Sequence, residues 1–72
     1  MREELNNKML SVNIDTNHLD IFEVEVKVKI NKNLLETIIV PYSSLENYKQ
    51  ELFSSCTSTI HDVQELNKKY RV

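Results

Sequence analysis

The chain has 72 residues, of which 28% are charged and 40% are apolar, and its formal net charge is −2. A chain this short buries only about 60% of the surface that its unfolded form exposes, so we expect one domain, residues 1–72, with a thin core. The slightly acidic balance gives no electrostatic reason to approach a nucleic-acid backbone, which proteins bind chiefly through clustered Lys and Arg.

Cysteine usage and hydropathy bear on the compartment. Cys56 is the single cysteine, so no disulfide can form within the chain, as is typical of proteins in reducing compartments. The N-terminal residues lack the apolar stretch of a signal peptide, and no apolar run approaches the roughly 20 residues of a membrane span. We therefore expect a cytoplasmic protein with no membrane segment.

The composition also lacks Gly, Ala and Trp, while Asn, Lys and Ile are plentiful. This bias is typical of an AT-rich genome, such as that of a low-GC bacterium or one of its phages. Without Gly, no glycine-rich phosphate-binding loop can form, and left-handed backbone positions fall to residues that tolerate them, such as Asn or Asp.

The N-terminal part of the chain predicts a short helix followed by a strand. Met1, Leu5 and Met9 recur every four residues, which favours a helix over residues 1–8. Apolar and polar residues then alternate over residues 9–14, as in a strand, and a polar segment that follows reads as a turn.

The clearest pattern in the chain lies between Ile21 and Ile30. Apolar and charged residues alternate there without interruption, which predicts a strand with one buried face and one solvated face. The predicted buried set is Phe22, Val24, Val26, Val28 and Ile30, and the solvated set is Glu23, Glu25, Lys27 and Lys29.

A tight hairpin is expected at residues 31–33, because Asn tolerates a positive φ better than other non-glycine residues. The apolar run over residues 34–40 then predicts a third strand, which fits against the second in two registers. A loop of two or four residues pairs Val28 with Thr37 and keeps Glu36 outside, whereas a three-residue loop buries Glu36 beside Val28.

The cost of charge burial favours the first of these registers. Burying an unpaired carboxylate costs several kcal/mol, against about 0.2 to 1 kcal/mol for a cross-strand pair. The favoured register pairs Ile30 with Leu35 and Val26 with Ile39, and sets Lys29 opposite Glu36. It also places Ile21, Ile38 and Val40 on the outer face of the sheet.

The C-terminal third predicts helical structure. Pro41 ends the third strand, and Ser43 with Glu46 has the spacing of a capping box. The apolar positions that follow lie in one stripe roughly 140° wide on a helical projection. They are Leu45, Tyr48, Leu52, Phe53, Cys56, Ile60, Val63, Leu66 and Tyr70.

Two interpretations of this region remain open. Six poor helix formers at residues 54–59 and a second capping-box spacing, Thr59 with Asp62, favour two helices. The unbroken phase of the apolar stripe favours one helix over residues 44–70, bent near Thr57, and we adopt that interpretation. Such a helix is about 40 Å long and overhangs a ten-residue strand of about 33 Å.

These elements predict an α+β architecture, with a three-stranded antiparallel meander, a long C-terminal helix on one face and a short N-terminal helix. In this order of elements the chain resembles certain small phage-encoded inhibitors, among them some anti-CRISPR proteins. The resemblance is one of layout and covers no motif, and the chain lacks the dense acidic surface by which several such proteins imitate DNA.

Two groups of residues suggest chemistry, and each has a structural alternative. Cys56 near His61 and Asp62 could act as a nucleophile, but a lone cysteine in an apolar stripe is more often a core residue. A second group, in the segment of the predicted first turn, could hold a metal, but acidic residues in turns have a local structural role. Its members are Asp15, His18 and Asp20. We expect no catalytic residue, no metal site and no cofactor.

A surface that binds another protein is the expected functional feature. An apolar centre with a polar rim is common at interfaces, and the predicted outer face of the sheet has both. The predicted partner-binding residues are Ile21, Glu23, Glu25, Lys27, Lys29, Ile38 and Val40. The sequence therefore predicts a small non-enzymatic binding module, most concretely a phage or mobile-element inhibitor of a host protein.

Other functions compete for the same surface. The overhanging helix and the partly apolar outer face predict a homodimer, so the chain is alternatively a self-assembling structural or accessory subunit. The basic C-terminal turn with Lys68, Lys69 and Arg71 leaves a small nucleic-acid-binding regulator as a third hypothesis, although such residues are expected there to complement the helix dipole.

Overall fold

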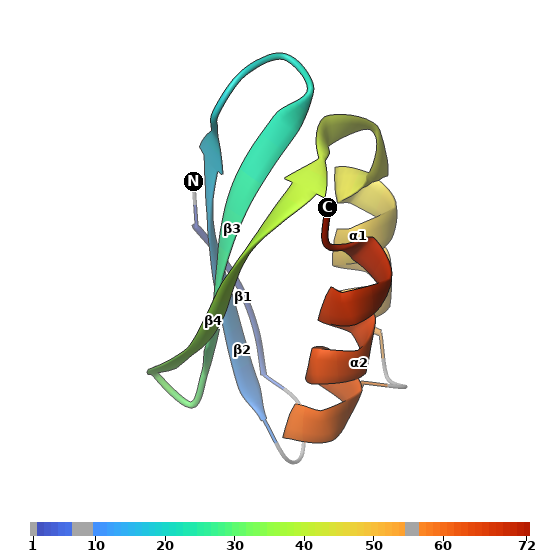
Figure 1. The fold of residues 1–72 in the computed structure, drawn as a ribbon. Coiled ribbons are helices and arrows are strands. Elements are labelled where there is room, and N and C mark those ends of the chain that lie inside the picture. The colour runs from blue at the N-terminus through green and yellow to red at the C-terminus, as the bar shows by residue number, and fades with distance from the viewer. Residues whose placement is uncertain (1, 7–9, 55–56) are drawn as a thin grey trace.

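The computed structural model describes residues 2–6, 10–54 and 57–72, and it combines a four-stranded antiparallel sheet with two helices on one face (Figure 1). The strands lie in the order β1-β2-β3-β4. The elements are β1 (Arg2–Asn6), β2 (Ser11–His18), β3 (Glu23–Ile30), β4 (Asn33–Pro41), the 3-10 turn η1 (Tyr42–Ser44), α1 (Leu45–Leu52) and α2 (Ile60–Tyr70). The predicted α+β class and the meander β2-β3-β4 are confirmed.

The predicted N-terminal helix is wrong where the structure describes it. Arg2–Asn6 form β1, which pairs antiparallel with β2 and sets Leu5 opposite Val12. Residues 1, 7 and 8 of the predicted helix lie outside the described residues. A helix of two turns is marginal in water, whereas a strand beside β2 gains a ladder of backbone hydrogen bonds along its whole length.

The strand β2 runs through the predicted turn, four residues beyond the predicted end of the strand at Ile14. His18 pairs with Val24 and Thr16 pairs with Val26, so the polar segment is part of the sheet, not a connection. The turn comes at residues 19–22, and β3 begins at Glu23. Phe22, predicted to be buried, therefore precedes the strand and is exposed.

Alternation along β3 confirms its predicted buried face, apart from Phe22. The buried apolar side chains of the sheet and helices form one core between the two layers. They are Leu10, Val12, Ile14, Val24, Val26, Val28, Ile30, Ile38, Val40, Leu45, Tyr48, Leu52 and Val63.

The β3-β4 hairpin closes with a two-residue loop, Asn31 and Lys32, whose φ angles are 51° and 71°. Two successive positive φ values make the tight turn that matches the twist of the flanking strands. The side chain of Asn31 also accepts a hydrogen bond from the Ser11 N–H at 3.0 Å, and its own N–H donates to the Ser11 carbonyl at 2.8 Å. The predicted role of Asn at this turn is confirmed.

A bulge next to this turn shifts the register of β4. Lys29 pairs with Leu34 beside the loop, but Val28 pairs with Glu36, so Leu35 is the additional residue. The predicted register is therefore wrong. Val26 pairs with Ile38 instead of Ile39, and the following residues of β4 shift with them.

The shift exchanges the two faces of β4. Ile38 and Val40, predicted on the outer face, are fully buried in the core, and Ile39 is exposed. Val24 pairs with Val40, which extends the apolar face to the end of the sheet. Glu36 lies on the same face as Ile38, toward the helices.

Glu36 is tolerated on the helix side because its carboxylate is paired. The side-chain amide of Asn67 donates to Glu36 Oε1 at 2.6 Å, and the Tyr48 hydroxyl donates to Asn67 Oδ1 at 2.6 Å. The Arg71 guanidinium lies 4.0 Å from Glu36 Oε2. The predicted register assumed an unpaired carboxylate, and this assumption fails because α2 supplies the partners.

Tyr48 and Asn67 are fully buried, so their hydrogen bond has no water to replace it. Burial, and to a smaller extent the negative charge of Glu36, raise the pKa of the Tyr48 hydroxyl far above its ordinary value. The hydroxyl therefore stays protonated and remains a donor to Asn67. We call Tyr48, Asn67 and Glu36 the core triad.

The C-terminal region forms two helices, so the single bent helix is wrong and the second interpretation holds. Ser54 Oγ and Thr57 Oγ1 both donate to the Glu51 carbonyl at 2.8 Å, and end α1 by taking over a backbone acceptor. Thr59 then starts α2 with the predicted capping box, in which Asp62 N donates to Thr59 Oγ1 and Thr59 N donates to Asp62 Oδ2, both at 3.2 Å.

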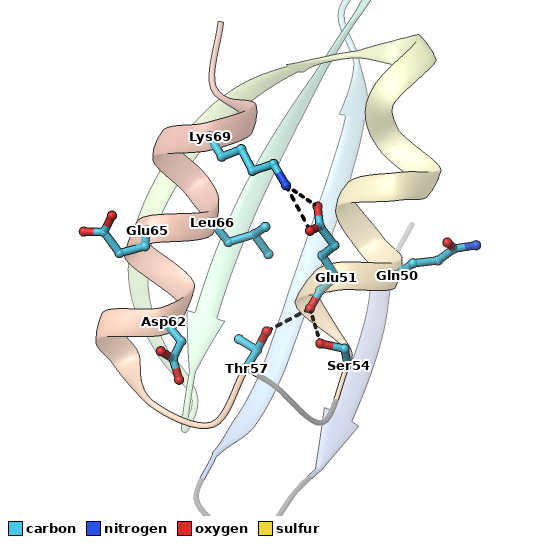
Figure 2. Close-up of a pocket in the computed structure, with 8 residues that line it drawn as sticks. All are labelled: Gln50, Glu51, Ser54, Thr57, Asp62, Glu65, Leu66 and Lys69. Carbon is cyan, nitrogen blue, oxygen red and sulfur yellow. Dashed lines mark hydrogen bonds and ion pairs between the residues drawn. The ribbon is translucent and has the colours of Figure 1, made fainter.

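The two helices lie side by side and run in opposite directions over the sheet (Figures 1 and 2). The predicted overhang is therefore absent, because α1 and α2 are only about 12 and 16 Å long at 1.5 Å per residue. The break also rotates the apolar stripe, so that Ile60 is exposed and Asn67 is buried. At the other boundary, Ser44 and not Ser43 is the N-cap of α1, without a side-chain cap.

Removing the Tyr48 hydroxyl should destabilise the fold measurably. In Tyr48→Phe the buried Asn67 carbonyl loses its donor, and an unsatisfied buried polar group costs about 1–3 kcal/mol. Urea unfolding at neutral pH measures this loss. The matched control is Tyr70→Phe, which removes a hydroxyl at a more exposed position and should cost less. A Tyr48→Phe protein as stable as the wild type would contradict the assigned role.

Candidate functional site

The predicted partner-binding residues do not form one surface. Ile38 and Val40 are in the core, and Ile21 lies in the β2-β3 connection. The four charged residues of β3 do lie on the outer face, as predicted, and Lys29 Nζ is 3.7 Å from Asp15 Oδ2 on β2. They are Glu23, Glu25, Lys27 and Lys29.

Over β2, β3 and β4, the strands whose side chains the structure describes, the outer face of the sheet lacks its expected apolar centre. On β4, Ile39 stands opposite Glu25 and Thr37 stands opposite Lys27. Leu34, which is 58% exposed, lies at the far end beside the hairpin turn. This face is chiefly polar where an apolar centre was expected, and it is the surface that a solvated sheet presents.

Exposed apolar side chains gather instead at one end of the sheet. We call residues 19–22 the apical loop; it joins β2 to β3 at the end opposite the β3-β4 hairpin and stands clear of the helices (Figure 1). Within it, Leu19 is 47% exposed, Ile21 is 79% exposed and Phe22 is 71% exposed. Three large apolar side chains within four residues on a convex loop are a candidate contact surface.

Hydrogen bonds hold the backbone of the apical loop. Asp20 Oδ1 accepts from the Phe22 N–H at 2.6 Å and from the Glu23 N–H at 2.8 Å. The N–H groups of Leu19 and Asp20 both donate to the Glu23 carbonyl, at 3.1 and 3.4 Å. An Asp side chain that bonds the backbone two residues on is a local turn device, and here it fixes the loop that presents Ile21 and Phe22.

The loop is also attached to the end of β4. The Tyr42 N–H donates to the Phe22 carbonyl at 2.7 Å, and the Tyr42 ring packs on His18 with centroids 5.4 Å apart. Tyr42 is itself about half exposed, so it extends the apolar surface of the apical loop toward α1.

Sequence reasoning found Ile21 but missed the other members of this surface. Phe22 has the same parity as the buried residues of β3, so alternation alone assigns it to the core. The informative signal is Asp20, a turn-forming residue placed directly before two large apolar residues.

A second concave feature lies between the two helices (Figure 2). Leu66 points from α2 toward α1, whereas Gln50 and Glu65 point away from the gap. The groove is shallow and open to solvent. Its lining residues are Gln50, Glu51, Ser54, Thr57, Asp62, Glu65, Leu66 and Lys69.

The polar groups at the centre of this groove bind one another. Lys69 Nζ lies 3.1 Å from Glu51 Oε1 and 3.4 Å from Oε2, and the Tyr70 hydroxyl donates to Glu51 Oε2. The hydrogen bond from Tyr70 first, and that from Lys69 second, hold the pKa of Glu51 below its ordinary value. Glu51 therefore joins the two helices, and this explains the groove structurally.

The structure does not bring the described residues among those considered for catalysis and metal binding into one site. Cys56 lies outside the described residues, and His61 is exposed with Nε2 at 3.9 Å from Glu65. Asp62 serves in the capping box. Within residues 10–54 and 57–72, no group of three His, Cys, Asp or Glu side chains comes together to hold a metal, so Asp15, His18 and Asp20 do not form the site considered above.

The basic residues of α2 and the tail each pair with a carboxylate. Lys68 lies 3.6 Å from Glu65, Lys69 lies 3.1 Å from Glu51, and Arg71 lies 4.0 Å from Glu36. Paired cations offer less attraction to phosphate than a cluster of unpaired ones.

The exposed edge of β4 is protected against another strand. The Val72 N–H donates to the Ile39 carbonyl at 2.9 Å, so the C-terminal tail covers part of this edge. The bulge at Leu35 and the inward-facing carboxylate of Glu36 are two further devices that discourage strand addition. Docking at this edge is therefore disfavoured.

Comparison of the chain with protein-family models, curated proteins and solved structures finds no match. Among the described residues, no helix is long and apolar enough to cross a membrane.

The contacts of Glu51 predict a pH dependence of stability. A carboxyl whose pKa is lowered by folding contributes stability above its unfolded value, here 4.5, and loses it as the pH falls through the folded value. The difference in unfolding free energy between wild type and Glu51→Gln should thus be largest near neutral pH and shrink in acid.

Chemical denaturation between neutral pH and about pH 3 measures this difference. The matched control is Glu65→Gln, on the solvent side of α2, which should give a smaller difference near neutral pH. A Glu51→Gln difference that stays constant down to the acid end of the range would contradict the assigned contacts.

Proposed function

We propose that this chain is a small non-enzymatic protein-binding module that acts in the cytoplasm, most concretely as a phage or mobile-element inhibitor of a host protein. The observation that carries the proposal is the apical loop, in which Leu19, Ile21 and Phe22 are exposed on a backbone held by Asp20. This surface replaces the outer sheet face expected from the sequence.

The physical argument rests on preorganisation. Association costs the ordering of loops and side chains, and a loop whose backbone is already fixed loses less on binding. A few large anchors that enter a partner's pocket commonly supply most of the binding free energy. Ile21 and Phe22 are the most exposed large apolar side chains of the loop, so they are the expected anchors.

Two other surfaces are already engaged in contacts within the chain, which leaves the apical loop as the better candidate for binding a partner. The polar groups of the helix groove are engaged in joining α1 to α2, and the β4 edge is covered in part by the tail. The meander and the two C-terminal helices keep the order of elements in which the sequence resembles small phage-encoded inhibitors. The N-terminal element departs from that order, because it is a strand and not a helix.

Self-assembly remains a second candidate because the same apolar loop could meet its copy in a homodimer. Such contact would bury Ile21 and Phe22 from both protomers around a two-fold axis. The apical loop is then the seam of an accessory subunit and not a site for a foreign partner.

A comparative pull-down tests the proposal. The bait variants are wild type, Ile21→Ser/Phe22→Ser, and the control Leu34→Ser, which removes a comparably exposed apolar side chain at the opposite end of β3. We expect a host protein that is retained by wild type and Leu34→Ser and lost by the double variant. That protein, identified by mass spectrometry and purified, should bind the double variant at least about 100-fold more weakly.

Folding must be unchanged for this comparison to count. Substitutions at exposed positions usually alter stability by no more than about 0.5 kcal/mol, so all three baits should give the same circular dichroism spectrum. Equal binding of the purified protein by wild type and the double variant would refute a role for the apical loop. Loss of self-association alone, by sedimentation equilibrium, would establish the homodimer instead.

A further inference from the structure

We propose that the partner receives the apical loop in an apolar pocket rimmed by Lys and Arg. The inference rests on the proposed function and specifies the chemistry of the partner. It follows from two features of the described residues, the convex shape of the loop and the sign of the charges that surround it.

The shape of the loop requires a concave partner. Ile21 and Phe22, the most exposed large apolar side chains of the loop, belong to a connection that projects beyond the helical layer (Figure 1). Ile21 is 79% exposed and Phe22 is 71% exposed, so neither is covered by the rest of the chain, and a flat surface would leave much of both in water. A pocket in a folded protein is the surface that removes both from water.

The charges around the loop are acidic. From His18 to Val26 the charged residues are Asp20, Glu23 and Glu25, and the first cation along the strand is Lys27. Asp20 Oδ1 is bound to the backbone, but the residue is exposed to solvent. The apolar side chains of the loop are thus flanked along the chain by the carboxylates of Asp20, Glu23 and Glu25, which we call the acidic ring.

The neighbouring helix adds to this ring. Glu46 of α1 lines the same hollow as His18 and Tyr42, and its side chain is exposed. Lys49 lines this hollow too, but its side chain is largely buried and its ammonium lies 3.6 Å from the Glu46 carboxylate. Electrostatic complementarity at an interface sets opposite charges against each other, so the rim of the partner should be basic.

The same charges disfavour the other occupants. A cytoplasmic membrane surface is anionic and attracts basic segments, so it would repel this ring. A second copy of the chain that met tip to tip would bring the two acidic rings together, at a cost from like charges. The helix groove of a second copy is no better suited, because its charged lining has three carboxylates and Lys69.

The test uses the full chain and the partner protein purified through the pull-down described above. Association rates and Kd are measured for wild type, Glu23→Lys and the control Glu65→Lys, which makes the same charge change on α2. At low salt, Glu23→Lys should slow association about tenfold, whereas Glu65→Lys should change it less than about twofold. Raising the salt concentration from about 50 to about 300 mM should weaken wild-type binding. It should also reduce the difference in association rate between wild type and Glu23→Lys.

Each other result overturns the inference in a distinguishable way. Unchanged or faster association of Glu23→Lys, with Ile21→Ser/Phe22→Ser still deficient, would refute the basic rim and leave the proposed function standing. Loop-dependent binding to vesicles of equal parts phosphatidylcholine and phosphatidylserine would make a membrane the occupant. Loop-dependent dimerisation of the purified chain, with no partner captured, would make a second copy the occupant. Capture independent of the loop would refute the proposed function itself.

Discussion

The paired carboxylate of Glu36 is the constraint on which the rest of the structure depends. Its place on the core side of β4 requires the amide of Asn67, and Asn67 in turn requires the Tyr48 hydroxyl, so one chain of two hydrogen bonds joins β4, α2 and α1. Buried polar networks specify one arrangement when every member is satisfied and are costly otherwise. The core triad therefore ties the register of the sheet to the position of both helices.

The register then determines which surfaces are available for function. With Glu36 opposite Val28, the apolar residues of β4 that sequence reasoning placed outside complete the core, and the outer face of the sheet stays polar. The broken helix has a similar effect, because two short helices cover the core side by side without an overhang. Among the described residues, three exposed large apolar side chains lie together in the apical loop, where Asp20 fixes the backbone.

Much of this fold could be predicted from local patterns. Alternation identified β3, Asn31 provided the hairpin turn, and Thr59 with Asp62 marked the start of α2. The misplaced elements depend on contacts distant in sequence. No pattern in the sequence marks the bulge at Leu35. The partner of Glu36 is Asn67, which lies 31 residues further along the chain. The candidate surface was missed for a different reason. Phe22 has the same parity as the buried residues of β3, so alternation assigns it to the core, but β3 begins one residue later and Phe22 is exposed.

The central claim is that Glu36 faces the helices, and the pairing of β3 with β4 tests it most directly. Nuclear Overhauser effects between Hα atoms are strong for opposed residues that do not exchange hydrogen bonds, whose Cα atoms lie about 4.5 Å apart. Glu25 and Ile39 form such a pair. The Ile39 carbonyl points away from β3, because it accepts from Val72, and the Phe22 carbonyl, three residues before Glu25, accepts from Tyr42 on the β4 side. The account predicts a strong Hα contact between Glu25 and Ile39. Strong Hα contacts between Glu25 and Val40 and between Lys27 and Ile38 in its place would show the register with Glu36 in solvent and would contradict the account.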